Sequence, residues 1–318
     1  MKILTTVPAH TLQDLAEENR WLIKDLWTEN AVGIIGGEPK CCKSFLALSV
    51  AISVASGTSC LQRYPVLKKG KVLLFAAEDG LSMVRRRLEG ISSSVGQELK
   101  DLEIDVITEA VLRLDREEDQ ERLRITIEKI RPKLLILDPF VRLHRIDENS
   151  SGEVAPILAN LRELQRKYNL SIIIVHHAKK GASTQRAGQA LRGSSEFHAW
   201  GDVNLYMRRD GNESLNLTIE HRSAKSEKGI PLELVADGEI VHLKIADDKK
   251  GVILKNKLST LEKVEEVFRE MEGPVPLALI RKKIGGRAST VSMILKEMVR
   301  QGQLDQVKGG YCFQSSNK

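Results

Sequence analysis

Short apolar runs alternate along most of the chain with longer segments in which apolar residues recur at helical spacing. The runs that predict strands are residues 31–35, 71–77, 104–108, 134–137 and 171–175. The segments that predict the intervening helices are residues 46–56, 81–88, 117–130 and 154–168. Strands that are apolar on both faces and alternate with helices are typical of a mostly parallel sheet covered by helices on both sides. The pattern therefore predicts an α/β fold.

Outside this alternation the pattern changes. Residues 11–24 form a predicted amphipathic helix, and we expect Trp21 and Trp27 near its far end to lie in the core. Residues 203–208 and 215–220 have the short apolar runs of antiparallel strands.

The C-terminal region has a different character. The elements predicted there are helices at 258–271, 277–283 and 288–301 and a hairpin at 304–313 around Gly309-Gly310. Three helices followed by a hairpin predict a winged helix-turn-helix. The expected domains are an N-terminal helical segment (1–30), an α/β domain (31–246), a charged linker (247–257) and the winged helix-turn-helix domain (258–318).

Composition and cysteine usage narrow the class of protein. Hydrophobic residues make up 42% of the 318 residues and charged residues 29%, which suits a soluble protein with a sizeable core. The net charge of +6 permits a polyanionic partner. No apolar run approaches the roughly 18 residues of a membrane span. The cysteines, which suit a reducing cytoplasm and include no C-x-x-C pair for zinc, are Cys41, Cys42, Cys60 and Cys312.

The stretch from Gly36 to Phe45 organises the chain. It joins the first buried strand to the first helix and fits the pattern G-x-x-x-x-G-K-[ST] at every fixed position but one. Gly37 is the first glycine, Lys43 can reach the β- and γ-phosphates, and the Ser44 hydroxyl can hold Mg²⁺. Backbone N–H groups of the loop and the following helix N-terminus would cradle the phosphates. The stretch therefore predicts a P-loop that binds ATP.

The exception is Cys42, which stands where the pattern has its second glycine. A Cβ at this position can crowd the loop or oppose a backbone angle that glycine adopts easily. Two alternatives stay open: a plain strand–helix turn with a chance Lys-Ser pair, and a true P-loop fold that has lost tight ATP binding.

The polar residues that end the apolar strands lie where a parallel sheet collects ligands, and they are Lys43, Glu78, Asp138 and His176. Asp138 matches a Walker B aspartate, which holds Mg²⁺ through its shell. We expect the strand before Glu78 to neighbour the P-loop strand, where a carboxylate can deprotonate the attacking water. The alternative for Glu78 is a helix N-cap pair with Asp79.

Basic residues and a histidine pair are further candidates. His176-His177 can sense a γ-phosphate, or can be strand-end histidines with satisfied hydrogen bonds. A long segment without acidic residues can follow a phosphate backbone or be a solvated loop, and its cations are Lys179, Lys180, Arg186 and Arg192. The turn of the predicted winged helix carries Arg281, Lys282, Lys283 and Arg287. Residues 258–318 hold ten Lys or Arg against seven Asp or Glu, a modest net charge of +3 that also suits a protein partner.

Together these residues resemble the RepA-like branch of the RecA-type ATPases, which contains plasmid-encoded hexameric replicative helicases and is related to DnaB and RadA/KaiC-type proteins. The resemblance covers roughly residues 20–245. The ordered fragments that carry it are W-L-I-K (21–24), G-G-E-P-K-C-C-K-S (36–44), A-E-D-G (77–80), R-R-R-L (85–88), L-I-L-D-P-F (135–140), L-H-R-I-D-E-N (143–149), V-H-H-A-K-K (175–180), R-G-S-S (192–195) and H-R-S-A-K (221–225).

The resemblance implies roles for individual residues. ATP would be held by Gly37, Glu38, Pro39, Lys40, Cys41, Cys42, Lys43, Ser44 and Phe45. Ser44 and Asp138 would hold Mg²⁺, Glu78 would be the catalytic base, and His176 or His177 would couple the γ-phosphate to a DNA loop. The residues that match the zone from which such hexamers reach the neighbour's ATP are Arg222 and Lys225.

The resemblance also implies partners. The loops after Asp138 and His177 face the central channel in such rings, so the residues implied in binding single-stranded DNA are Lys179, Lys180, Arg186 and Arg192. A winged helix is not needed for a RepA-type ring, and here it can bind duplex DNA through Lys282, Lys283 and Arg287.

The leading hypothesis is a RecA-like, ATP-dependent DNA motor, a hexameric ring helicase of a mobile element that acts in DNA replication. The first alternative is a DNA-binding regulator or loader whose ATPase core is an oligomerisation switch. The second is a structural partner with an inactive site.

Overall fold

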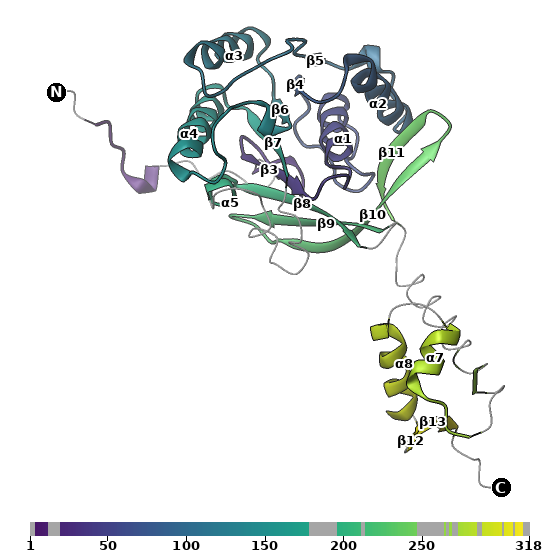
Figure 1. The fold of residues 1–318 in the computed structure, drawn as a ribbon. Coiled ribbons are helices and arrows are strands. Elements are labelled where there is room, and N and C mark those ends of the chain that lie inside the picture. The colour runs from purple at the N-terminus through teal and green to yellow at the C-terminus, as the bar shows by residue number, and fades with distance from the viewer. Residues whose placement is uncertain are drawn as a thin grey trace. The chain divides into compact units, whose positions relative to one another are not determined.

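The computed structural model describes residues 4–11, 20–177, 196–210, 214–246, 264, 267–268, 273–284, 288–300, 302–307 and 309–313. The chain divides into two compact units, residues 1–246 and residues 247–318. Figure 1 shows the helices and strands of each unit.

Nine of the described strands form one sheet in the first unit, in the order β11-β10-β9-β8-β3-β7-β6-β4-β5. Their bounds are β3 Val32–Gly37, β4 Val72–Ala76, β5 Ile104–Val106, β6 Leu134–Asp138, β7 Ser171–His177, β8 Val203–Asp210, β9 Ser214–His221, β10 Glu227–Asp237 and β11 Ile240–Ile245. Neighbours from β8 through β5 are parallel. Neighbours from β8 through β11 are antiparallel. The predicted α/β fold with a mostly parallel sheet is thus confirmed.

Helices cover both faces of this sheet (Figure 1). Their bounds are α1 Lys43–Ser56, α2 Leu81–Ser94, α3 Glu117–Ile130, α4 Ser151–Tyr168 and α5 Glu196–Trp200, with 3-10 turns η1 Ala9–Thr11, η3 Leu99–Asp101 and η4 Phe140–Arg142. One buried cluster joins alternate strand residues to α1 and α2, and a second joins the other residues to α3 and α4. Among the described helices, none is long and apolar enough to cross a bilayer.

The helix predicted at residues 11–24 is wrong over its last four residues. Residues 21–24 are not helical, because β1 (Trp21–Ile23) pairs with β2 (Trp27–Thr28) in a small separate sheet. Residues 12–19 lie outside the described part of the chain. Both tryptophans are buried, as predicted. Apolar residues four positions apart, such as Leu22 and Leu26, are typical of one face of a helix. A tight turn between two short strands can bury the same residues together.

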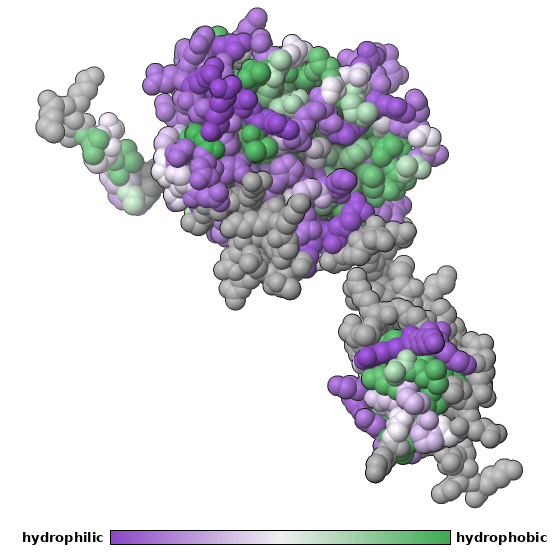
Figure 2. All heavy atoms as spheres, viewed as in Figure 1, coloured by the Kyte–Doolittle hydropathy of each residue, from purple (hydrophilic) through white to green (hydrophobic). Residues whose placement is uncertain are grey.

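The strands β10 and β11 were not predicted. Their hairpin packs along α2, where Gly90 lets the two backbones approach closely, since an added Cβ would lie 3.1 Å from the Val241 nitrogen. Many residues of both strands are only partly buried, so their apolar pattern is weak. The hydrophilic residues that dominate the view in Figure 2 fit helices with one buried and one solvated face.

The second unit contains two helices and a hairpin among its described residues. They are α7 Leu277–Ile284, α8 Ala288–Arg300, β12 Leu304–Val307 and β13 Gly310–Phe313. Their apolar faces meet in a separate core that also includes Val264, Val267 and Phe268. These three residues are the only described part of the helix predicted at 258–271, and Arg287 lies outside the described residues. The winged helix-turn-helix therefore stays a prediction.

The close approach of β3 and β8 depends on Gly33, and substitution of this residue tests it. A Cβ at Gly33 would lie 1.7 Å from the carbonyl oxygen of Val203 and 2.8 Å from the ring of Trp27. We expect Gly33→Ala to lower the free energy of unfolding of the first unit by about 3 kcal/mol, because neither neighbour can move freely. Urea unfolding followed by tryptophan fluorescence reports on this unit, which holds Trp21, Trp27 and Trp200.

Gly152→Ala is the matched control for that variant. Gly152 lies in the first turn of α4 with no atom within 4 Å of an added Cβ, so alanine should be neutral or stabilising. Equal urea-unfolding midpoints for Gly33→Ala and Gly152→Ala would contradict a close approach of β3 and β8 at Gly33.

Candidate functional site

The loop between β3 and α1 begins with a residue that has to be glycine. Gly37 has φ of 156°, and an added Cβ would lie 2.2 Å from the carbonyl oxygen of Met207 on β8 and 2.8 Å from Cys41 Sγ. A side chain here would push β3 and β8 apart or displace the loop. The first glycine of the P-loop pattern is therefore required by packing against the neighbouring strand.

Cys42 adopts the left-handed conformation that the pattern reserves for glycine. Its φ and ψ are 63° and 27°, and it forms the N-cap of α1 without a side-chain capping hydrogen bond. Lys40 is also left-handed, with φ of 63°. Arg209 Nη2 donates to the Lys40 carbonyl oxygen at 3.2 Å and lies 3.9 Å from Cys42 Sγ. The loop thus keeps a P-loop-like bend at an expected cost of about 1 kcal/mol for the cysteine.

Lys43 is the first residue of α1 and its side chain is buried, with 6% of the residue exposed. Its Nζ donates to the Glu38 carbonyl oxygen at 2.8 Å. Burial lowers the pKa of Lys43, and the nearby Cys41 thiol opposes that shift. The carboxylates of Asp138 and Glu78 also raise the pKa of Lys43, so both lie within electrostatic reach of Nζ.

Asp138 ends β6 and accepts a hydrogen bond from the Ser44 hydroxyl. Burial raises the pKa of Asp138 to about 6, against the opposing effect of that hydrogen bond. The negative charges of Asp79 and Glu78 add to the rise. A serine hydroxyl at the helix start beside a strand-end aspartate is the pair that holds Mg²⁺ in P-loop enzymes.

Glu78 lies two residues beyond β4, and the expected position of that strand is wrong. β4 pairs with β6 and β5, while β7 and β6 separate it from β3. The Ala76–Asp138 register still brings Glu78 beside Asp138, because their strands adjoin. The Glu78 side chain is 45% exposed, and its Oε1 lies 3.1 Å from Arg142 Nε.

The helix-cap alternative for Glu78 is not supported. The N-cap of α2 is Gly80, without a side-chain capping hydrogen bond. Asp79 instead pairs with Arg87 of α2, whose guanidinium lies 5.2 Å from the Phe45 ring centroid.

The two strand-end histidines face opposite sides of the sheet. Along β7, Ile173 and Val175 belong to the cluster under α1, so alternation places His177 on that side and His176 on the other. His176 is 1% exposed and stacks on Phe197 at 4.3 Å. The geometry therefore favours His177 as the histidine that faces the loop.

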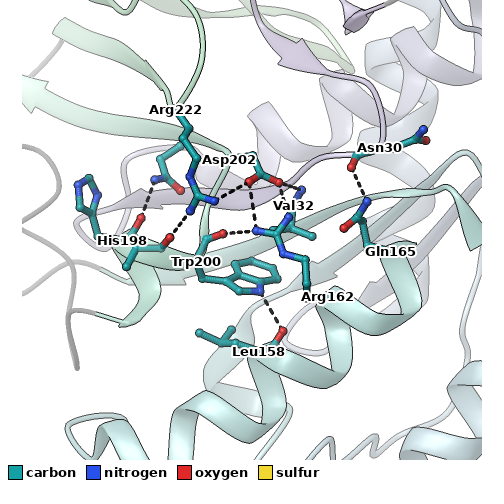
Figure 3. A network of polar contacts seen from close by, with 11 residues as sticks. Asn30, Val32, Leu158, Arg162, Gln165, His198, Trp200, Asp202 and Arg222 are labelled. Carbon is teal, nitrogen blue, oxygen red and sulfur yellow. Dashed lines mark hydrogen bonds and ion pairs between the residues drawn. The ribbon is translucent and has the colours of Figure 1, made fainter. Parts of the chain in front are cut away.

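Several predicted contacts lie elsewhere. Lys179, Lys180, Arg186 and Arg192 lie outside the described residues. Lys282 and Lys283 are exposed in the last turn of α7. Arg222 and Lys225 follow β9, at the sheet edge opposite the P-loop, and Figure 3 shows Arg222 beside Asp202.

Residues that sequence reasoning missed also contribute to the site. Arg142 of η4 and Arg209 of β8 lie against Glu78 and the loop, and neither belongs to a motif. The proximity of Arg142 to Asp138 along the chain was the only available signal.

The donors present fit a nucleoside triphosphate with Mg²⁺. Within the described part of the chain, the buried ammonium of Lys43 is held by one thiol and one backbone carbonyl. It lies beside the N-terminus of a 14-residue helix, and a buried cation and a helix N-terminus both favour an anion. The carboxylate of Asp138 and the hydroxyl of Ser44 are oxygen donors of the kind that Mg²⁺ prefers.

Comparison with known proteins agrees with this geometry. The family model AAA_25, described as an AAA domain, matches residues 2–183, more than half of the chain. The crystal structure of the RadB recombinase is similar with a TM-score of 0.50 at 16% identity, covering 69% of this chain and 92% of that one. The structure of a DnaB-like replicative helicase is similar with a TM-score of 0.51 at 16% identity, covering 67% of this chain and 57% of that one. At this identity the two structures establish a shared RecA-like fold.

The raised pKa of Asp138 predicts how the stability of the unliganded chain depends on pH. Between about pH 4 and pH 6 the folded chain retains a proton that the unfolded chain releases, so stability falls as the pH rises through this window. Asp138→Asn removes this loss. We expect the variant to match wild type at pH 4 and to be more stable by about 2 kcal/mol at pH 7.5.

The measurement is the difference in urea-unfolding free energy between the two chains at each pH, in which titrations that both chains share cancel. Glu78→Gln, at a side chain that is 45% exposed, serves as the control: it removes only the smaller electrostatic contribution to the raised pKa of Asp138 and leaves the burial, so most of the pH dependence should remain. A difference between Asp138→Asn and wild type that stays constant from pH 4 to pH 7.5 would exclude this role for burial.

Proposed function

The chain belongs to the AAA_25 family of AAA domains, and from that premise we propose that it is an ATP-dependent DNA motor, a RepA/DnaB-like ring helicase. The observation that carries the proposal is the convergence of three groups from three elements. Lys43 begins α1, Asp138 ends β6 and Glu78 follows β4, and all three act on one another electrostatically.

The proposed chemistry follows from these positions. Lys43 would leave the Glu38 carbonyl and bind the β- and γ-phosphates, and Ser44 and Asp138 would hold Mg²⁺, whose charge would offset that of the phosphates. Glu78 orients the attacking water and accepts its proton once Arg142 releases its carboxylate. His177 faces the γ-phosphate side and links it to the basic segment that follows β7.

Arg222 and Lys225 are assigned to a neighbouring chain's ATP. Their position opposite the P-loop supports this assignment, since neither can approach the nucleotide of its own chain. A ring of identical chains, a hexamer in our proposal, would place each pair at the next site. The DnaB-like replicative helicase, which shares the fold, supports this choice of assembly by analogy.

The DNA contacts are proposed from charge. We assign single-stranded DNA in the channel to Lys179, Lys180, Arg186 and Arg192, and duplex DNA to the second unit, as a winged helix, through Lys282, Lys283 and Arg287. The exposed lysines at the end of α7 support the second assignment.

The second candidate is an ATP-binding regulator or loader in which nucleotide binding switches assembly. Two observations favour it: the left-handed Cys42 in the loop, and the Arg142 side chain paired with the proposed base. A switch needs ATP binding without rapid turnover.

ATP hydrolysis with and without single-stranded DNA decides between these functions. We expect DNA to stimulate turnover of the wild-type chain, Lys43→Ala to abolish it, and Glu78→Gln to lower kcat by about 10² to 10⁴ while nucleotide still binds. Binding without turnover would support the switch. Absence of binding, with Lys43→Ala indistinguishable from wild type, would leave only a structural role.

Cys42→Gly tests whether loop strain limits the site. Glycine adopts the left-handed conformation of residue 42 without the steric cost of a Cβ, so we expect tighter ATP binding by severalfold. Isothermal titration with a non-hydrolysable ATP analogue measures the change. Cys60→Ser, at a buried cysteine outside the loop, is the control for simple loss of a thiol.

The salt dependence of duplex binding tests the second unit. We expect Lys282→Ala/Lys283→Ala to weaken binding by the full chain and to flatten the slope of log K against log salt by about 2. Lys129→Ala, at an exposed lysine of α3, should leave the slope unchanged. A flat salt response of the wild-type chain would favour a protein partner for this unit.

A further inference from the structure

Arg222 lies at the edge of the sheet where β3 and β8 begin. The Asp202 N–H donates to the Val32 carbonyl oxygen at 2.8 Å, and the Arg222 N–H donates to the Asp202 carbonyl oxygen at 2.9 Å. The P-loop begins at Gly37, five residues farther along β3, or about 17 Å away at the usual rise. Arg222 therefore cannot reach the loop of its own chain, so a nucleotide that its guanidinium contacts has to belong to another chain.

Asp202 is held by a second arginine. Arg162 of α4 grips its carboxylate with both guanidinium ends, Nη1 at 2.5 Å from Oδ2 and Nη2 at 3.1 Å from Oδ1. The Val32 N–H donates to the same carboxylate at 3.2 Å. Arg162 also donates to the Trp200 carbonyl oxygen at 2.5 Å, and the Trp200 indole N–H donates to Leu158 at 2.9 Å. Figure 3 shows Asp202 between Arg162 and Arg222, with Trp200 beside Arg162.

Arg222 itself makes two polar side-chain contacts with the described residues. Its Nη1 lies 3.2 Å from Asp202 Oδ1, and its Nη2 donates to the Ala199 carbonyl oxygen. Its side chain is 54% exposed and lies between two surface hollows of about 380 and 250 Å³. The guanidinium is thus oriented by its partners and still accessible from outside.

Arg162, Asp202 and Arg222 form a charged trio in which two arginines share one aspartate. If Asp202 were paired with Arg222 alone, it would cancel the charge of Arg222 and hold its guanidinium in place. Arg222 would then be a poor partner for a phosphate. The bidentate Arg162 neutralises Asp202, so the trio keeps a net charge of +1 that is carried by the exposed Arg222. Arg162 is the better-buried of the two arginines, at 19% against 54% side-chain exposure.

We propose that Arg162 is a positioning residue for Arg222: it neutralises Asp202, so that Arg222 is aimed at the next chain's ATP without losing its charge. The inference rests on the proposed function, in which Arg222 stabilises transition-state charge in a neighbouring site. The competing explanation is that Arg162 only stabilises the fold, and charge-balanced variants separate the two.

The experiment compares ATP turnover by the full chain carrying Arg162→Gln, Arg162→Gln/Asp202→Asn or Arg162→Lys. Arg162→Gln leaves the trio neutral, and we expect kcat to fall roughly tenfold while the KM for ATP changes less than about twofold. The double variant restores the net charge of +1 and should recover kcat to within about threefold of wild type. Arg162→Lys keeps the charge and should behave like the double variant.

A purely structural role predicts the opposite order, because the double variant has lost more hydrogen bonds than Arg162→Gln. Melting of each variant is followed by tryptophan fluorescence. If Arg162→Gln does not fold, the two charge-retaining variants still test the inference. A charge-retaining variant that folds but has a kcat at least tenfold below that of wild type would overturn it.

Mixing chains tests the action on a neighbour. Lys43→Ala chains have no working loop but carry an intact Arg162, Asp202 and Arg222, so adding them to Arg162→Gln chains should raise turnover above that of either alone. No rise would overturn the inference. If the wild-type chain hydrolyses ATP and Arg222→Ala hydrolyses it equally fast, the inference is overturned. If the wild-type chain does not hydrolyse ATP, the proposed function itself is overturned.

Discussion

The burial of the Lys43 ammonium at the start of α1 is the constraint on which the site depends. The loop needs Gly37 against β8 and a left-handed residue 42 to bring this charge under the sheet edge. Water is largely excluded there, and the partners of the cation among the described residues are a backbone carbonyl and a thiol. The same burial raises the pKa of Asp138 to about 6. Both groups are better satisfied when an anion and a divalent cation enter together, which is why the pair fits a metal-bound triphosphate.

The parallel sheet gives its two edges different tasks. The carboxyl ends of β3, β6 and β4 gather the loop and the carboxylates, while the opposite edge holds Arg222 on its aspartate. Because the strands are stiff and parallel, these edges cannot approach one another within a chain. In the proposed function, an assembly of copies is therefore part of the chemistry, since one chain's arginine completes the next chain's site.

Much of the first unit could be predicted from the sequence because its elements are specified locally. The helix Glu117–Ile130 has the predicted bounds, and the buried strands are short, continuously apolar runs with polar residues at their ends. Prediction failed where two structures share one pattern. Trp21 and Trp27 would be buried by a helix or by a tight two-stranded turn, and only packing against the core selects the turn.

The sequence alone determined the class of the fold and the phosphate loop, because a glycine, a lysine and a serine at fixed spacing have a local structural meaning. It did not determine which strands adjoin, which histidine faces the loop, or which acid holds which arginine. Glu78 lies at the site because its strand, β4, pairs with β6 and not with β3. Arg222, Asp202 and Arg162 come together from separate elements. Those contacts depend on strand order and on the side of the sheet that each residue faces, and residues distant in sequence set both only when the chain packs.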